Sequence, residues 1–116
     1  MRLYDVVVAF NATDSLAGNN EISPAEQWAI YKFRKEAKTH CDFYAERESV
    51  IREKYLEYAD ETGKLQGEKM EEYVKEYNEL NNLEVELNCK KEKLHIVNGI
   101  DFTVIEKLDK FFEFVV

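Results

Sequence analysis

The sequence predicts a mainly α-helical protein of the α+β class: a long antiparallel helical hairpin flanked by short helices and a small β element. Two observations predict the hairpin. No Gly or Pro interrupts the chain between Pro24 and Gly63, and apolar residues on both sides of Gly63 recur at helical spacing. Of the 116 residues, 45% are apolar, which suffices for one core, so we expect residues 1–116 to form a single domain.

The first helix of the hairpin is expected to run from Ser23 to Gly63. Ser23 can cap its start, Pro24 suits its first turn, and Glu26 can close a capping box. A helix of this length would measure about 55 Å, so the molecule is a rod unless the helix bends near Arg47 and Glu48, where its apolar stripe is interrupted. The stripe comprises Ile30, Ala37, Tyr44, Ile51 and Tyr58 at seven-residue spacing, with Phe33, Cys41 and Tyr55 between them.

A short turn over residues 60–67, bracketed by two glycines, predicts that the second helix runs antiparallel to the first. This second helix is expected to start near Glu68. Its predicted inner side carries Met70, Tyr73, Val74, Tyr77, Leu80 and Leu83. Its predicted outer side carries Glu71, Glu72, Glu76 and Glu79.

Two segments fit two structures each. Residues 2–17 favour a helix of about four turns, but the Val6-Val7-Val8 run leaves a strand over residues 2–10 as the alternative. From Leu83 to Val97, apolar and polar residues alternate, which predicts extended chain and a hairpin turning at Lys90–Glu92. A continued helix is the competing interpretation there, since several leucines also fit helical spacing.

The C-terminal segment is expected to be a turn followed by an amphipathic helix. Asn98-Gly99 predicts the turn, and Thr103 with Glu106 resembles a capping box. The expected helix would dock on the hairpin through Val104, Ile105, Leu108, Phe111, Phe112 and Val115.

The net charge of −8 is concentrated on the second arm of the hairpin, where residues 60–88 carry nine acidic and three basic groups. Such a surface repels nucleic acid and attracts basic protein surfaces, although it also keeps a protein in solution. No apolar run is long enough for a membrane helix, and we expect no signal peptide, so the predicted location is the cytoplasm, with Cys41 and Cys89 reduced.

The sequence contains no motif that predicts catalysis, a metal or a cofactor. It has no Gly-rich phosphate loop, paired CxxC, HExxH or nucleophile elbow. The soft-ligand candidates are only His40, Cys41, Cys89 and His95, and the adjacent His40 and Cys41 point apart on a helix. The two basic clusters, around Lys35 and around Lys91, each have acids nearby, so direct nucleic-acid binding is not expected.

Protein binding is therefore the predicted activity, through an acidic row and tyrosines at the edges of the core. The carboxylates of such a row could occupy positions that phosphates take on a basic partner. The candidate acidic residues are Glu68, Glu72, Glu76, Glu79 and Glu86. The candidate tyrosines are Tyr44, Tyr55 and Tyr58.

The layout resembles a family of short proteins of unknown function encoded by tailed phages and prophages of Gram-positive bacteria. The residues that carry the resemblance are Ile30-Tyr31-Lys32-Phe33-Arg34-Lys35, the run Tyr55-Leu56-Glu57-Tyr58-Ala59-Asp60-Glu61-Thr62-Gly63-Lys64, Leu94-His95-Ile96, and the closing segment around Ile105 and Leu108. The resemblance implies a phage origin and a small accessory role in the bacterial host cell. It supplies no catalytic residues.

The function expected from these observations is non-enzymatic inhibition of a host protein, such as a defence or nucleic-acid-processing protein with a basic surface. The first alternative is a virion assembly or scaffolding factor that forms homo-oligomers through the hairpin. The second alternative is a small metal-dependent hydrolase or nuclease.

Overall fold

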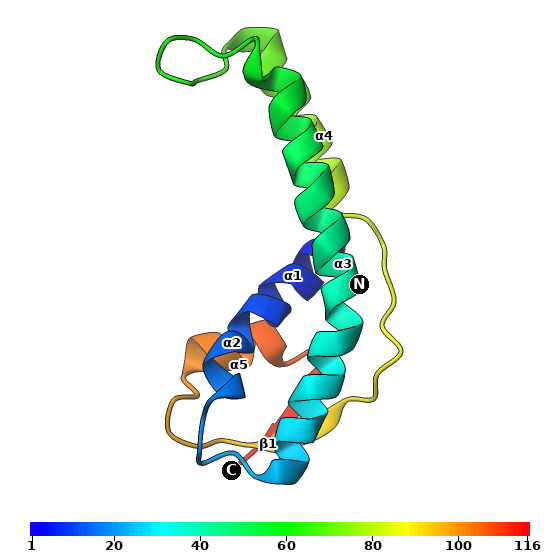
Figure 1. The fold of residues 1–116 in the computed structure, drawn as a ribbon, viewed down its shortest axis with the longest axis vertical. Helices are drawn as coiled ribbons and strands as arrows, with labels where there is room; N and C mark the ends of the chain where they lie inside the picture. Colours follow the sequence, from blue (N-terminus) through cyan, green and yellow to red (C-terminus); the bar gives the residue numbers. More distant parts are fainter.

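The computed structural model describes all residues from Met1 to Val116 and shows an elongated molecule (Figure 1). Its principal extents are 50 × 28 × 18 Å, and its radius of gyration of 17.4 Å exceeds the roughly 13 Å expected of a compact chain of this length. The elements are α1 (Leu3–Ala12), α2 (Asp14–Ala17), α3 (Pro24–Leu56), α4 (Gly67–Asn81), β1 (Glu92–His95), α5 (Phe102–Leu108) and β2 (Phe112–Val115). The predicted mainly α-helical hairpin fold with a small β element is confirmed.

The long helix α3 organises the molecule. The Ser23 hydroxyl accepts a hydrogen bond from the Glu26 N–H as predicted, while the Glu26 carboxylate bonds to His95 instead of closing a capping box. The helix is unbroken through Arg47, but it ends at Leu56 rather than at Gly63. Gly63, at φ +80°, serves the turn that follows, where a side chain would be strained.

The predicted stripe on α3 faces the core for most of its length. Ile30, Phe33, Ala37, Tyr44, Ile51 and Tyr55 are buried. Cys41 is half-buried, and Tyr58 lies beyond the helix with 47% of its surface exposed, so its assignment to the stripe is wrong. The reason is that α3 ends at Leu56, two residues before Tyr58.

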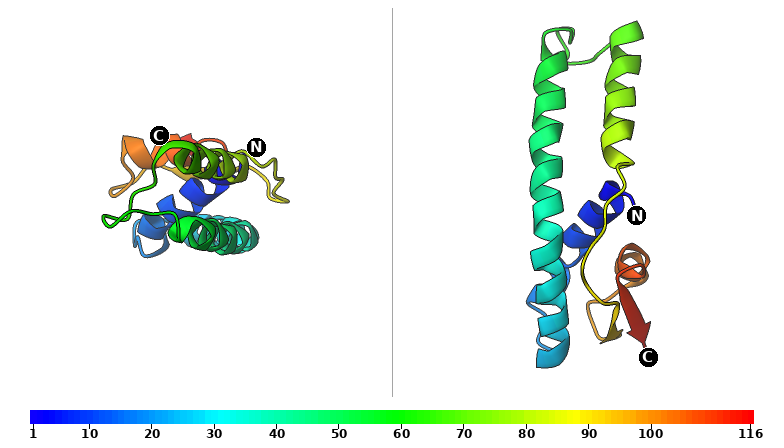
Figure 2. Two further views of the ribbon diagram at one scale, coloured as in Figure 1. Left: turned by 90° about the horizontal axis from the view of Figure 1, so that it is seen from above. Right: turned by 90° about the vertical axis from the view of Figure 1, so that its right-hand side faces the viewer.

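Helix α4 runs back along α3, and the two helices lie side by side in Figure 2. Its predicted inner side is only partly correct. Leu80 is buried and Tyr73 and Tyr77 are half-buried, but Met70 and Val74 are 44% and 42% exposed. The reason is that α4 packs mainly on α3. The predicted apolar stripe of α4 is wider than this contact, so Met70 and Val74 at its outer edge stay uncovered.

The N-terminal segment is helical, which settles residues 2–17 in favour of the helix. Leu3, Val6 and Ala9 of α1 are buried against α3 and α5. Arg34 of α3 ties the junction of α1 and α2, since its Nη1 donates to the Thr13 hydroxyl at 2.6 Å and to Asp14 at 2.8 Å.

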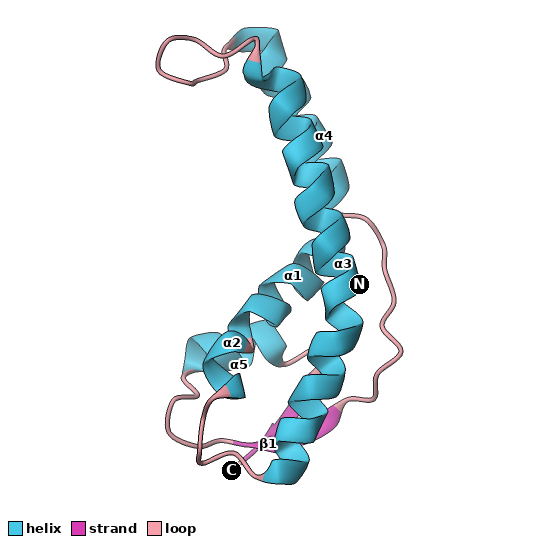
Figure 3. Cartoon of the chain, viewed as in Figure 1, coloured by secondary structure: helices cyan, strands magenta, loops and turns pink.

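The β element differs from the predicted hairpin at Lys90–Glu92. Residues 83–91 are extended, with Val85, Leu87 and Cys89 half-buried between exposed polar neighbours, but they form no hairpin. Instead β1 pairs in parallel with β2, placing Leu94 opposite Phe114. Both strands lie at the end of the molecule remote from the hairpin turn (Figure 3).

The closing helix is shorter than predicted and has a different cap. Asp101, rather than Thr103 and Glu106, caps α5, because its carboxylate accepts the Val104 N–H at 2.9 Å. The helix ends at Leu108, and the residues from Phe112 onward form β2. A run of bulky apolar residues fits a buried strand as well as a helix face, and pairing with β1 decided between them.

The buried residues form two separate clusters, which divide the molecule into two regions. We call residues 43–83, the distal part of the hairpin, the arm, and the remaining residues the base. The base holds a cluster of 13 buried residues, including Phe33, Leu94 and Leu108. The arm cluster has five, namely Leu3, Tyr44, Ile51, Tyr55 and Leu80, so α1 contributes Leu3 to the root of the arm.

Candidate protein-binding surface on the arm

The structure divides the predicted acidic row into paired and unpaired residues. Glu76 forms an ion pair with Lys54 of α3, and Glu72 with Lys69 at 3.3 Å. Both glutamates are half-buried on the flank of α4 that faces α3, so their assignment to the outer side is wrong. Their carboxylates already have lysine partners and are therefore poorly placed to recruit a basic protein.

The remaining predicted glutamates are exposed. Glu68 and Glu79 lie on α4 and form no ion pair. Glu71 is also exposed on α4 and also forms no ion pair. Glu86 lies apart from them, on the extended segment of the base. Glu68, Glu71 and Glu79 are thus three unpaired carboxylates on one helix.

Apolar side chains lie among these unpaired glutamates. Met70 and Val74 are one turn apart on α4 and line a shallow hollow. The other residues of the hollow are Glu71, Lys75, Asn78, Glu79 and Asn82. An exposed apolar pair surrounded by polar groups and unpaired carboxylates is the composition of a contact surface.

Two of the three predicted tyrosines belong to the core. Tyr44 is buried, and its hydroxyl donates to Asn81 Oδ1 at 2.7 Å. Tyr55 is buried against the edge of the Tyr73 ring, with centroids 5.6 Å apart. Only Tyr58 is available to a partner, and Lys69 Nζ lies 4.3 Å from the centre of its ring. The assignment of Tyr44 and Tyr55 to a partner-binding edge is therefore wrong.

The tyrosine hydroxyls inside the hairpin stay protonated. Burial raises the pKa of Tyr44, and burial together with a hydrogen bond to Glu48 raises the pKa of Tyr77. Neutral hydroxyls can donate, so they join the two helices by hydrogen bonds without adding charge to the core. The role of these hydroxyls is therefore to stabilise the arm.

The tip of the arm is an ordered turn. Asp60 Oδ1 accepts from the Thr62 hydroxyl at 2.6 Å, the Thr62 N–H at 2.8 Å and the Lys64 N–H at 3.0 Å. The Thr62 hydroxyl and these backbone donors lower the pKa of Asp60 to about 2. The turn thereby holds Leu56, an exposed side chain at the end of α3, beside the first turn of α4.

The next feature is the set of side chains that could bind a metal ion or act as nucleophiles. No three His, Cys, Asp or Glu side chains are grouped so that they could hold a metal ion. Both cysteines are free thiols, and burial raises the pKa of Cys41 to about 11, which disfavours the reactive thiolate.

A second feature, a groove at the base, was not predicted from the sequence. A groove between α3 and residues 87–92 contains Trp28 and Tyr31 from α3 and lysines from both segments. The i, i+3 spacing of Trp28 and Tyr31 on a predicted helix could have indicated an aromatic pair. The meeting of lysines about 55 residues apart in the chain could not have been seen.

Comparisons with protein-family models, with curated proteins and with solved structures found no match to this chain. None of its helices combines the length and the apolar character needed to cross a membrane. The functional conclusion therefore depends on the surfaces described above.

Proposed function

We propose that this chain is a small binding protein whose arm docks on a basic surface of another protein. The observation that carries the proposal is the arm itself, which projects past the base as a pair of helices that α1 covers only at the root (Figures 1 and 2). Only five buried residues hold it, and one of these, Leu3, comes from α1. Such a protrusion adds little to the main core, which supports a role in contact.

The chemistry of α4 supports a basic partner. Unpaired carboxylates on Glu68, Glu71 and Glu79 attract cationic surfaces over about a Debye length, which speeds the encounter. Met70 and Val74 between them supply apolar area that would be buried on docking. Proteins that bind nucleic acid carry basic surfaces, so we propose a nucleic-acid-processing or defence protein of the bacterial host as the target and a phage-type inhibitor as the role.

Site-specific crosslinking tests whether the arm makes the contact. A photoreactive phenylalanine analogue replaces Val74 in one variant and Phe102, which is exposed on the base, in the control. We expect a discrete crosslinked partner from the Val74 position in host cells and none from Phe102. Equal crosslinking from both positions would contradict the proposal.

Charge variants then test the acidic face with the purified partner. Glu68→Gln, Glu71→Gln and Glu79→Gln combined should weaken binding about tenfold at low salt, since each exposed charge contributes up to about 1 kcal/mol. The matched control removes three exposed acids of the base, by Glu106→Gln, Asp109→Asn and Glu113→Gln. Equal affinities of the two triple variants would rule out a role for the acidic face.

A second candidate function, particle assembly through self-association, has one observation in its favour. Phe43, Val50 and Leu83 are exposed on the arm, and they line a shallow hollow of about 300 Å³ between α3 and the C-terminal end of α4. Sedimentation velocity over a hundredfold concentration range tests it. Oligomers that disappear in Val50→Asp would support assembly, and a monomer throughout would eliminate it.

A further inference from the structure

The groove of the base has the size of a small-molecule site. Its volume is about 560 Å³, within the range of roughly 300–1,000 Å³ typical of ligand pockets. One wall is the N-terminal third of α3, and the other is the extended chain from Leu87 to Glu92, with Phe111 and Phe112 also lining it. This groove lies apart from the arm and is independent of the function proposed for the arm.

Two aromatic rings stand exposed in the groove wall. Trp28 and Tyr31, one turn apart on α3, are stacked with their ring centroids 5.5 Å apart and their planes at 16°. Their exposed fractions are 58% and 55%, so neither ring is used by the core. Exposed stacked rings on a rigid helix provide a platform for a third flat ring.

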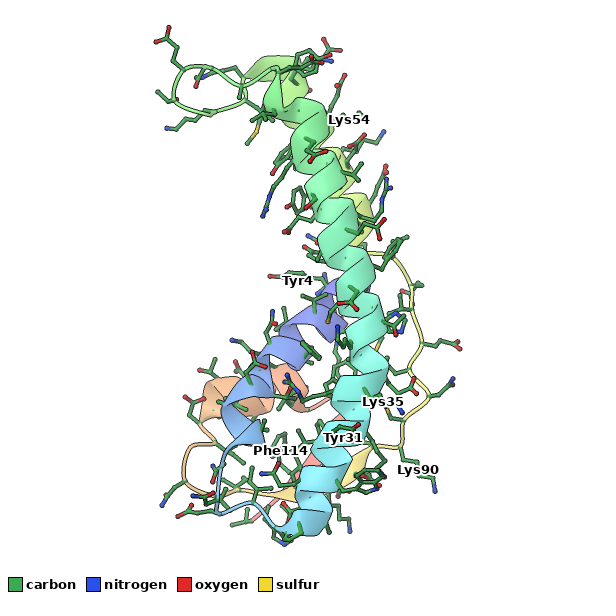
Figure 4. The ribbon with its side chains drawn as sticks, viewed as in Figure 1. Tyr4, Tyr31, Lys35, Lys54, Lys90 and Phe114 are labelled. Carbon is green, nitrogen blue, oxygen red and sulfur yellow. The ribbon has the colours of Figure 1, made fainter.

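Positive charge surrounds this platform. Lys35 of α3 and Lys90 and Lys91 of the facing segment line the groove and form no ion pair. Figure 4 shows Tyr31, Lys35 and Lys90 on the same side of the base. Two further lysines of the lining, Lys32 and Lys110, are held by Glu92 and Asp5 at 3.0 Å.

The lysines stand out against the charge of the whole molecule. The chain carries a net charge of −8, yet the groove lining contains five lysines and only two glutamates. Unpaired lysines that line one groove repel one another, and an anion between them relieves that repulsion. A ligand that is both flat and aromatic and negatively charged therefore complements the groove.

We propose that the groove binds one nucleotide, with its base stacked on Trp28 and Tyr31 and its phosphates between Lys35, Lys90 and Lys91. The volume suits a single nucleotide, and the acidic arm offers no continuation for a longer polyanion. A free mononucleotide and a nucleotide at the end of a single strand share this chemistry. Titration with both mononucleotides and an oligonucleotide separates these two sources.

Fluorescence of Trp28, the only tryptophan in the chain, reports on stacking directly. The full-length protein is titrated with AMP, ATP, a ten-residue single-stranded oligothymidylate, and tripolyphosphate, which has no base. We expect saturable quenching by the nucleotide probes and little effect of tripolyphosphate. ATP should bind more tightly than AMP because it brings more phosphate charge, and high salt should weaken both.

Calorimetry of matched variants completes the test. Trp28→Leu should weaken nucleotide binding about tenfold by loss of stacking, whereas Phe102→Leu, at an exposed aromatic of the base outside the groove, should not. Lys35→Gln with Lys91→Gln should weaken binding by about the same factor, and Lys64→Gln with Lys75→Gln, of equal charge change on the arm, should not. Circular dichroism checks that each variant keeps its helices.

The titrations distinguish a mononucleotide from a strand terminus, and they also show whether the groove binds nucleotides at all. Saturable binding of AMP or ATP identifies a mononucleotide site, and binding of the oligothymidylate alone identifies a strand terminus. No binding of any nucleotide, or equal affinity of the groove variants and their controls, would overturn the proposal. Neither result changes the expectation for the arm.

Discussion

The arm and the base share one helix but are stabilised in different ways. In the base, α3 is covered by α1, α2 and the two strands, and 13 buried residues form its core. In the arm, α3 packs mainly on α4, with α1 at the root, and four of the ten buried or half-buried residues packed there are tyrosines, namely Tyr44, Tyr55, Tyr73 and Tyr77. Burial of aliphatic and phenylalanine side chains holds the base, whereas aromatic edges and hydrogen-bonded hydroxyls hold the arm.

This difference supports the separate roles proposed for the two regions. A well-packed core resists local opening, while a two-helix protrusion with few buried contacts opens at lower cost. The arm could therefore adapt to the protein partner proposed for it, and the rigid wall of the base keeps the Trp28–Tyr31 pair in place.

The first prediction concerns the core of the base. Phe33 is buried against the rings of Phe111 and Phe112, with centroids 5.0 and 5.3 Å away. Phe33→Ala should lower the free energy of unfolding by about 3–5 kcal/mol, because it leaves a cavity. Urea denaturation measures this, with Phe43→Ala as the control, since Phe43 is exposed on the same helix and should change stability by less than about 0.5 kcal/mol.

The second prediction concerns the arm. Ile51→Ala removes a buried side chain between α3 and α4. Such a change lowers the free energy of unfolding by about 2–5 kcal/mol in a protein that unfolds as one unit. Here we expect hydrogen exchange to accelerate in α4 while the amides of α1 keep their protection, because the arm opens alone. Equal acceleration in both helices would show that arm and base unfold as one unit.

The third prediction concerns a polar contact of the base. Arg34 bridges α3 to Thr13 and Asp14, and its guanidinium lies 4.4 Å from the centre of the Phe10 ring. Arg34→Ala should cost about 1–3 kcal/mol, because Thr13 is fully buried and loses a charged donor. Thermal unfolding measures this loss. The control is Arg47→Ala, at an exposed arginine that forms no ion pair.

The fourth prediction is a pH dependence at the start of α3. Burial opposes ionisation of Glu26, but the His95 N–H and imidazole and the Ser23 hydroxyl lower its pKa below the ordinary value of 4.5. The stability that Glu26 contributes is therefore complete above about pH 4.5 and is lost as the pH falls through the lower folded-state pKa. The stability difference between the native chain and Glu26→Gln should shrink from pH 7 to pH 3, and a difference that does not change with pH would contradict this assignment.

The fifth prediction concerns the exposed tip of the arm. The carboxyl carbon of Asp60 should titrate by NMR with a pKa of about 2, below the ordinary 3.8. The order that this carboxylate gives to the turn is complete above about pH 3.8 and is lost as the pH falls toward 2. Thr62→Ala removes the main donor and should raise the pKa of Asp60, while Glu61→Gln, next in the chain, should leave it unchanged.

The local pattern of the sequence was sufficient for the helices. The Ser23 cap, the absence of helix breakers before Gly63 and the stripe from Ile30 to Tyr55 act within a few residues of each other, so they predicted α3 and its buried face. The two-glycine turn predicted the antiparallel return of α4 for the same reason. The end of α3 was misplaced, because Gly63 was needed by the turn rather than by the helix.

Contacts between distant segments decided the rest. Phe112–Val115 fits a helix face by its own pattern, and only pairing with β1 made it a strand. Glu76 belongs to an acidic row in the sequence, yet Lys54 on the neighbouring helix neutralises it. Lys35 and Lys91 are each near acids in the chain, but the fold places them together in one groove beside Trp28 and Tyr31. Sequence spacing determines which residues share a helix face, whereas the charge and burial of a surface depend on which other segment packs beside it.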